Sequence, residues 1–178
     1  MHETLPHFNY HPDPLKTRAI VRSDASCACC GEVRGFIYAA SVYSKHELDK
    51  KLCPWCIADG SAAAKFEASF TDDDPLLRKG IEKSIVAEVT QRTPGYSSWQ
   101  QETWLSHCDD ACEFHGDASV KEVADATSEA KREWIFEPKL SETNWQNITS
   151  RYSPDGDPAI YKFVCRHCRQ SFFSWDCS

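Results

Sequence analysis

The sequence lacks the features of a membrane or secreted protein. No apolar run approaches the roughly 20 residues that a membrane-spanning helix needs. The N-terminus, MHETLP, has neither the basic start nor the apolar stretch of a signal peptide. We therefore expect a cytoplasmic protein without membrane contact, in a compartment that keeps thiols reduced.

Motifs of the common enzyme classes are also missing. The chain has no P-loop, no dinucleotide fingerprint and no nucleophile elbow. His46-Glu47 and His2-Glu3 do not have the His-x-Glu spacing of a zinc deaminase. We therefore expect no enzymatic activity.

The charge balance has little of what nucleic-acid binding requires. With 27 acidic and 20 basic residues the net charge is −7, and no long cluster of Lys and Arg is present. A protein that binds the phosphate backbone normally carries a basic face. The charge balance therefore argues against nucleic acid as a partner, whereas an acidic surface suits a basic protein partner.

What the chain does have is ten cysteines, most of them in CxxC pairs. In a reducing compartment such pairs indicate a metal site rather than disulfides. Two thiolates in one tight knuckle, with two more from a second knuckle, complete the tetrahedral shell of a zinc ion. For the first zinc we predict the ligands Cys27, Cys30, Cys53 and Cys56. Cys29 lies inside the first knuckle and is expected to be a spare thiol.

A second zinc site is predicted from the remaining cysteines, which gives two Zn²⁺ per chain. Its expected ligands are Cys108, Cys112, Cys165 and Cys168. Because imidazole binds zinc as well as thiolate does, a histidine can replace one of these cysteines. The candidates for this exchange are His107, His115 and His167.

The second CxxC pair has an alternative interpretation. Cys53-Pro54-Trp55-Cys56 is close to the active-site pattern of glutaredoxin-like proteins. That chemistry requires a βαβ unit around the motif, which this sequence does not indicate. A zinc ion held by four thiolates is a poor activator of water, because its shell is closed. A thiol-redox protein or metalloenzyme is therefore the third-ranked hypothesis.

The first half of the chain predicts a treble-clef-like zinc finger. Residues 34–43 are rich in aromatic and β-branched residues and indicate a short hairpin. Ser44 and Glu47 fit a capping box before a helical turn. Cys53 and Pro54 then open a helix that is expected to run to Phe70, although Gly60 weakens it. The expected order is therefore a first knuckle, then a hairpin, then a second knuckle that leads into a helix.

The second half predicts helices followed by a zinc-ribbon-like hairpin. One helix is expected from Pro75 to Val89 and another from Ser119 to Trp134, the latter opened by a capping box of Ser119 and Glu122. Strands are expected at 159–164 and 171–175, with the third CxxC pair between them. The fold class is α+β, with subdomains at 1–74 and 75–178 packed as one unit.

Two segments are candidates for contact with a partner. The acids Asp72, Asp73 and Asp74 form a contiguous run, although short runs of this kind are usually only solvated. The aromatic residues Tyr96, Trp99 and Trp104 suit a protein interface or base stacking, although such residues are more often core.

Several motifs resemble the CbrC family of bacterial proteins. They are LP, Phe8 and YHPDPL within 5–15, CPWCIADG at 53–60, RTPGY at 92–96 followed by WQ at 99–100, and the CxxC pairs. Arg18 departs from the pattern, since a small residue such as Gly is expected there. The resemblance implies a role in tolerance of a nuclease colicin, as an immunity protein that neutralises a bacterial toxin. The alternative is a nucleic-acid-binding regulator built on zinc ribbons.

Overall fold

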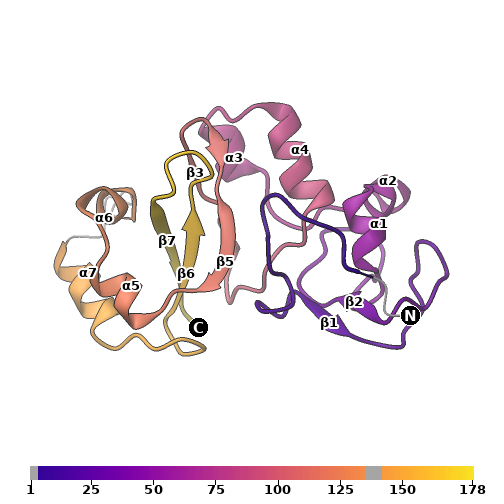
Figure 1. Ribbon diagram of the computed structural model, residues 1–178, viewed down its shortest axis with the longest axis horizontal. Helices are drawn as coiled ribbons and strands as arrows, with labels where there is room; N and C mark the ends of the chain where they lie inside the picture. Colours follow the sequence, from indigo (N-terminus) through magenta and orange to yellow (C-terminus); the bar gives the residue numbers. More distant parts are fainter. Residues whose placement is uncertain (1–3, 135–141) are drawn as a thin grey trace.

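The computed structural model describes residues 4–134 and 142–178, and it confirms the α+β class. Figure 1 shows two lobes joined by a helical segment. The N-terminal lobe contains β1 (Ile20–Arg22), β2 (Phe36–Tyr38), α1 (Pro54–Ala58) and α2 (Ser61–Phe66). The joining segment contains α3 (Asp74–Arg78) and α4 (Lys83–Arg92). The C-terminal lobe contains β3 (Ser106–His107), β4 (Asp110–Ala111), β5 (Glu113–Asp117), α5 (Val120–Ala124), α6 (Ser128–Trp134), α7 (Glu142–Thr149), β6 (Ala159–Val164) and β7 (Ser171–Asp176).

The hairpin of the N-terminal lobe encloses the first knuckle. Strands β1 and β2 pair antiparallel, with Ile20 opposite Tyr38. The predicted hairpin within 34–43 is therefore wrong, because β2 finds its partner before the knuckle rather than after it. The predicted capping box at Ser44 is also wrong, because no helix follows it. The Ser44 hydroxyl instead donates to the carbonyl of Phe66 at 2.8 Å.

Two glycines divide the predicted long helices. Gly60 has φ +80° and separates α1 from α2, and Gly80 has φ +74° and separates α3 from α4. A positive φ ends the run of helical hydrogen bonds, and glycine adopts it without steric cost. The short α1 that results begins at Pro54 and places Cys53 at its N-cap.

The C-terminal lobe is built on an antiparallel sheet of strand order β5-β6-β7 (Figure 1). The predicted hairpin is confirmed, with Ala159 opposite Asp176 and Val164 opposite Ser171. The capping box of Ser119 and Glu122 is also confirmed. The helix that it opens ends at Ala124, and α6 begins only at Ser128.

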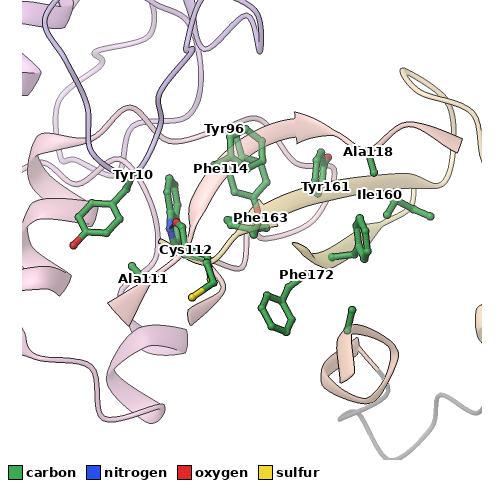
Figure 2. Close-up of a cluster of buried hydrophobic side chains, with 14 of the residues drawn as sticks. Tyr10, Tyr96, Ala111, Cys112, Phe114, Ala118, Ile160, Tyr161, Phe163 and Phe172 are labelled. Carbon is green, nitrogen blue, oxygen red and sulfur yellow. Dashed lines mark hydrogen bonds between the residues drawn. The ribbon is translucent and has the colours of Figure 1, made fainter. Parts of the chain in front are cut away.

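An aromatic cluster fills the centre of the C-terminal lobe (Figure 2). The ring of Tyr96 stacks on that of Phe114 at 4.2 Å between centroids. The indole N–H of Trp104 donates to the carbonyl of Cys112 at 2.9 Å. Tyr96 is only 4% exposed and Trp104 only 1% exposed. Both residues are therefore core, and the prediction that they contact a partner is wrong.

A second hydrophobic cluster, drawn from residues 8–70, lies in the N-terminal lobe. Helix α4 connects the two lobes, because Val86 and Val89 belong to the C-terminal cluster. The carbonyl of Thr90, also in α4, accepts a hydrogen bond from the N–H of Phe70 at 2.7 Å. No helix within residues 4–134 and 142–178 has both the length and the apolar content to cross a membrane.

Arg18 occupies a backbone position that favours glycine. Its φ is +62°, in the left-handed region where a side chain is strained. A small residue is expected here by resemblance, and the backbone conformation supplies the physical reason. The Arg18 guanidinium lies 3.7 Å from the Asp155 carboxylate of the C-terminal lobe.

Candidate metal centres

The four cysteines predicted for the first site lie together in the N-terminal lobe. The sulfur atoms of Cys27, Cys30, Cys53 and Cys56 are all within 4.8 Å of one another. The separations of Cys27 from Cys56 and of Cys30 from Cys53 are both 3.9 Å. A tetrahedral zinc with Zn–S bonds of about 2.3 Å places its sulfurs about 3.8 Å apart. The donor set therefore has the size that a zinc ion requires.

Local backbone structure presents these sulfurs inward. The Cys27 sulfur accepts hydrogen bonds from the N–H of Cys29 at 3.4 Å and of Cys53 at 3.2 Å. Cys53 and Cys56 lie at the start of α1, where N–H groups favour a thiolate. Burial outweighs this effect and raises the pKa of the Cys53 thiol to about 11 and that of the Cys56 thiol well above its usual range. Cys29, by contrast, turns away from the set, with its sulfur 3.5 Å from the Ser61 hydroxyl oxygen.

The first and third CxxC pairs form knuckles of the same shape. In the first knuckle the N–H of Gly31 donates to the carbonyl of Cys27, and in the third the N–H of Arg169 donates to the carbonyl of Cys165. The residue after each pair has a positive φ, +78° at Gly31 and +62° at Arg169. Each knuckle also joins two antiparallel strands, β1 with β2 and β6 with β7.

The second site contains a histidine in place of the predicted Cys112. The donor atoms of His107, Cys108, Cys165 and Cys168 lie within 4.8 Å of one another. His107 Nδ1 is 3.2 Å from the Cys108 sulfur and 3.4 Å from the Cys168 sulfur. A tetrahedral zinc ion separates a nitrogen and a sulfur ligand by about 3.6 Å. The set therefore fits zinc if the His107 nitrogen and the two sulfurs move slightly apart.

A tight turn explains why His107 and Cys108 reach this site together. Strands β3 and β4 form a hairpin whose two turn residues, Cys108 and Asp109, have φ values of +53° and +57°. Two successive positive φ values are the mark of a type I′ hairpin turn. The turn places Cys108 at its tip, beside the third knuckle, while His107 stays at the end of β3.

A carboxylate from α6 orients the His107 ring. His107 Nε2 lies 3.4 Å from Glu129 Oε1, on the opposite side of the ring from the cysteines. Histidines that bind metal commonly donate their other ring N–H to a carboxylate, which sets the tautomer and makes the ligand more basic. Glu129 is therefore part of this site, and sequence spacing alone did not indicate it.

Cys112 does not belong to the second donor set. It is fully buried and belongs to the aromatic cluster of the C-terminal lobe, as Figure 2 shows. It directly follows Ala111, the last residue of β4. His115 and His167 are also engaged elsewhere, His115 with Glu113 at 3.0 Å and His167 with Asp110 at 2.9 Å.

In each cluster the pKa of one cysteine is lowered even without a metal ion. Burial raises the pKa of the Cys27 thiol, but backbone N–H groups of Cys30, Cys53 and Cys29 outweigh it and lower the pKa to about 7. Burial also raises the pKa of the Cys165 thiol, but the N–H of Cys168 and the His107 side chain outweigh it and lower the pKa to about 6. Metal binding then deprotonates the remaining thiols.

Residues 5–177 match the model of the family described as "Uncharacterised protein family (UPF0167)". The chain belongs to this family. A UPF0167 protein of Pseudomonas aeruginosa is 50% identical over 177 residues, 99% of each chain. A UPF0167 protein of Mycobacterium bovis is 46% identical over 123 residues, 69% of this chain and 66% of its own. No solved structure matches this UPF0167 chain.

The acidic run is only partly available to a partner of this UPF0167 protein. Asp72 is half-buried and accepts a hydrogen bond from the Gln101 side chain at 2.6 Å. Asp74 is exposed and pairs with Arg78 at 2.7 Å within α3. Asp73 is exposed at the N-cap of α3. Asp73 is therefore the member of the run best placed to meet an incoming charge.

Proposed function

We propose that this UPF0167 protein binds two structural zinc ions and acts by binding a protein partner, as an immunity protein against a basic bacterial toxin. The observation that carries the structural role is the donor count: each cluster supplies four protein ligands. A catalytic zinc keeps one position open for water or substrate. Four-ligand sites leave no such position, which favours a non-catalytic protein.

The protein-binding part of the proposal is supported by charge and by resemblance. A net charge of −7 complements a basic partner and accelerates its association. The motifs shared with the CbrC family point to toxin tolerance. A toxin gene directly beside the gene of this protein would support the role, and a regulator's target genes there would favour the zinc-ribbon alternative.

Metal analysis tests the structural part. We expect about two zinc ions per chain in protein purified under reducing conditions and washed with a weak chelator. The physical reason is that both donor sets already have the spacing of tetrahedral zinc. Elemental analysis by mass spectrometry gives the count. A value near one zinc ion per chain would mean that one of the two sites does not bind zinc. A value near zero would contradict both proposed sites.

Association kinetics test the acidic run. We expect Asp73→Lys to slow association with a basic toxin encoded beside the gene by about threefold to tenfold at low salt, because charges at an interface rim act mainly on the association rate. The difference should shrink at high ionic strength through screening. Zinc content and melting temperature should not change, since Asp73 is exposed.

The matched control for this measurement is Asp49→Lys, which makes the same charge change at another exposed acid. Stopped-flow association at two salt concentrations separates a local effect from one of net charge alone. Equal rates for the two variants would remove the acidic run from the interface.

A further inference from the structure

Several large apolar side chains are exposed, and Trp99 is the most exposed of them among the described residues. Its side chain is 64% exposed. An exposed indole leaves a large apolar area in water, and Trp is the residue type most enriched at the energetic centres of interfaces. Because Tyr96 and Trp104 are core, Trp99 alone keeps the partner-contact role predicted for this segment.

The loop that carries Trp99 is held by a buried carboxylate. Asp176, at the end of β7, is 6% exposed. Its Oδ2 accepts hydrogen bonds from the Ser98 hydroxyl at 2.5 Å, from the N–H of Trp99 and from the N–H of Gln100 at 3.1 Å. Hydrogen bonds to a charged acceptor are the stronger ones. The indole is therefore presented on a fixed backbone, which lowers the entropy cost of binding.

A groove lies directly beside this loop. It has a volume of about 380 Å³, and the residues that define its chemistry are Ser97, Ser98, Trp99, Asp117, Asp155 and Tyr161. The charged residues that line it are both carboxylates, Asp117 and Asp155. The Asp117 carboxylate accepts the N–H of Asp155 at 2.6 Å, which fixes the two relative to each other.

Asp155 of the groove already pairs with one guanidinium, that of the protein's own Arg18, which is not among the residues that line the groove. The Arg18 guanidinium lies 3.7 Å from the Asp155 carboxylate, and the two side chains are 77% and 76% exposed. An exposed ion pair of this kind contributes little stability. A second guanidinium that also contacts the Trp99 ring and Asp117 can therefore displace it at small cost.

We infer that the Trp99 groove, defined by Trp99, Asp117 and Asp155, binds an arginine side chain of a basic protein partner. An aromatic face attracts a cation that lies over it, and Arg does so more often than Lys. The two carboxylates supply the opposite charge beside that face. This inference rests on the proposed protein-binding function and specifies the group that the partner presents.

The test uses the full chain and a blocked tri-arginine peptide as the probe. Titration of ¹⁵N-labelled protein is followed at the indole N–H of Trp99, assigned by its loss in Trp99→Phe. We expect this signal to shift with tri-arginine and not with tri-citrulline, which has a similar shape without the charge. A tri-lysine peptide should bind more weakly, because a compact ammonium does not stack on the ring.

Variants then identify the groove as the site. Trp99→Ala removes the cation–π contact and Asp117→Asn removes a charge-assisted hydrogen bond, and each is expected to weaken tri-arginine binding at least about fivefold. Asp49→Asn, which removes an exposed acid outside both the groove and the acidic run, is the matched control and should change binding less than about twofold. Unchanged binding in Trp99→Ala, or no shift of the Trp99 signal in the wild type, would overturn the inference.

The experiments distinguish a failure of the Trp99 groove from a failure of the proposed immunity function. If Trp99→Ala binds the peptide normally while Asp73→Lys slows toxin association, the groove fails and the protein-binding role stands. If the groove binds tri-arginine but no neighbouring toxin associates with the protein, the groove stands and the immunity role fails.

Discussion

Replacing Cys53 with serine is expected to abolish the folded N-terminal lobe. Structural zinc contributes on the order of 10 kcal/mol to the folding of small zinc modules, whereas a whole domain is stable by only about 5–15 kcal/mol. Cys53 is 1% exposed, belongs to the first donor set and occupies the N-cap position of α1. Circular dichroism should show lost secondary structure at ordinary temperature, and zinc analysis should show at least one ion fewer.

Cys29→Ser is the matched control, because it makes the same chemical change within the same lobe. Its sulfur points toward Ser61 and lies outside the donor set. We expect a change in the free energy of unfolding below about 0.5 kcal/mol and no loss of zinc. A Cys53→Ser protein that melts like the wild type would mean that the first site is not structural, and the redox interpretation of its CPWC motif would gain support.

The metal-binding knuckles were predictable from sequence because their geometry is local. A CxxC pair closes a turn with bonds among a few neighbouring residues, as in the shared bonds at Gly31 and Arg169. The hairpin at 159–176 was predictable for the same reason, since its strands are adjacent in the chain. The pairing of β1 with β2 was missed because both strands are short and residues 23–35 separate them, whereas only residues 165–170 separate β6 from β7.

Sequence reasoning named His107 among three histidines that could replace a cysteine in the second site, but it could not choose between them and Cys112. Cys112 and His107 are both plausible zinc ligands by residue type, and they are close in sequence. The choice depends on the turn at Cys108 and Asp109, whose positive φ values decide which neighbours face the third knuckle. Neither residue is a glycine, so the usual sequence signal for such a turn is missing.

Burial of the aromatic residues depended on similar long-range information. Tyr96, Trp99 and Trp104 share one irregular stretch, where no helical or strand period separates inner from outer positions. Tyr96 is drawn into the core by stacking on Phe114 of β5, whereas Trp99 is held outside by Asp176 of β7. Phe114 and Asp176 both lie outside the stretch of residues 96–104, in strands that come later in the chain. The local sequence pattern therefore could not indicate that Tyr96 is buried and Trp99 exposed.

His107→Ala is expected to reduce the metal content from about two zinc ions per chain to about one. The substitution leaves three cysteine ligands in the second set and removes the nitrogen that lies 3.2 Å and 3.4 Å from two of their sulfurs. The first site shares no residue with the second and should retain its metal. Elemental analysis of chelator-washed protein, with circular dichroism to follow the C-terminal hairpin, measures both effects.

Two further variants decide whether His107 acts as a ligand or only as a packed side chain. Glu129→Gln leaves the ring of His107 in place but removes the carboxylate that orients it, so zinc affinity at this site should fall about 10–100-fold while folding with saturating zinc is retained. Cys112→Ala should keep both zinc ions, because Cys112 is buried in the aromatic cluster. Loss of one zinc from Cys112→Ala together with full zinc content in His107→Ala would reverse the assignment and restore the set of four cysteines. Competition with a chromophoric chelator resolves the outcomes, since it reports affinity for each site separately from the amount of folded protein.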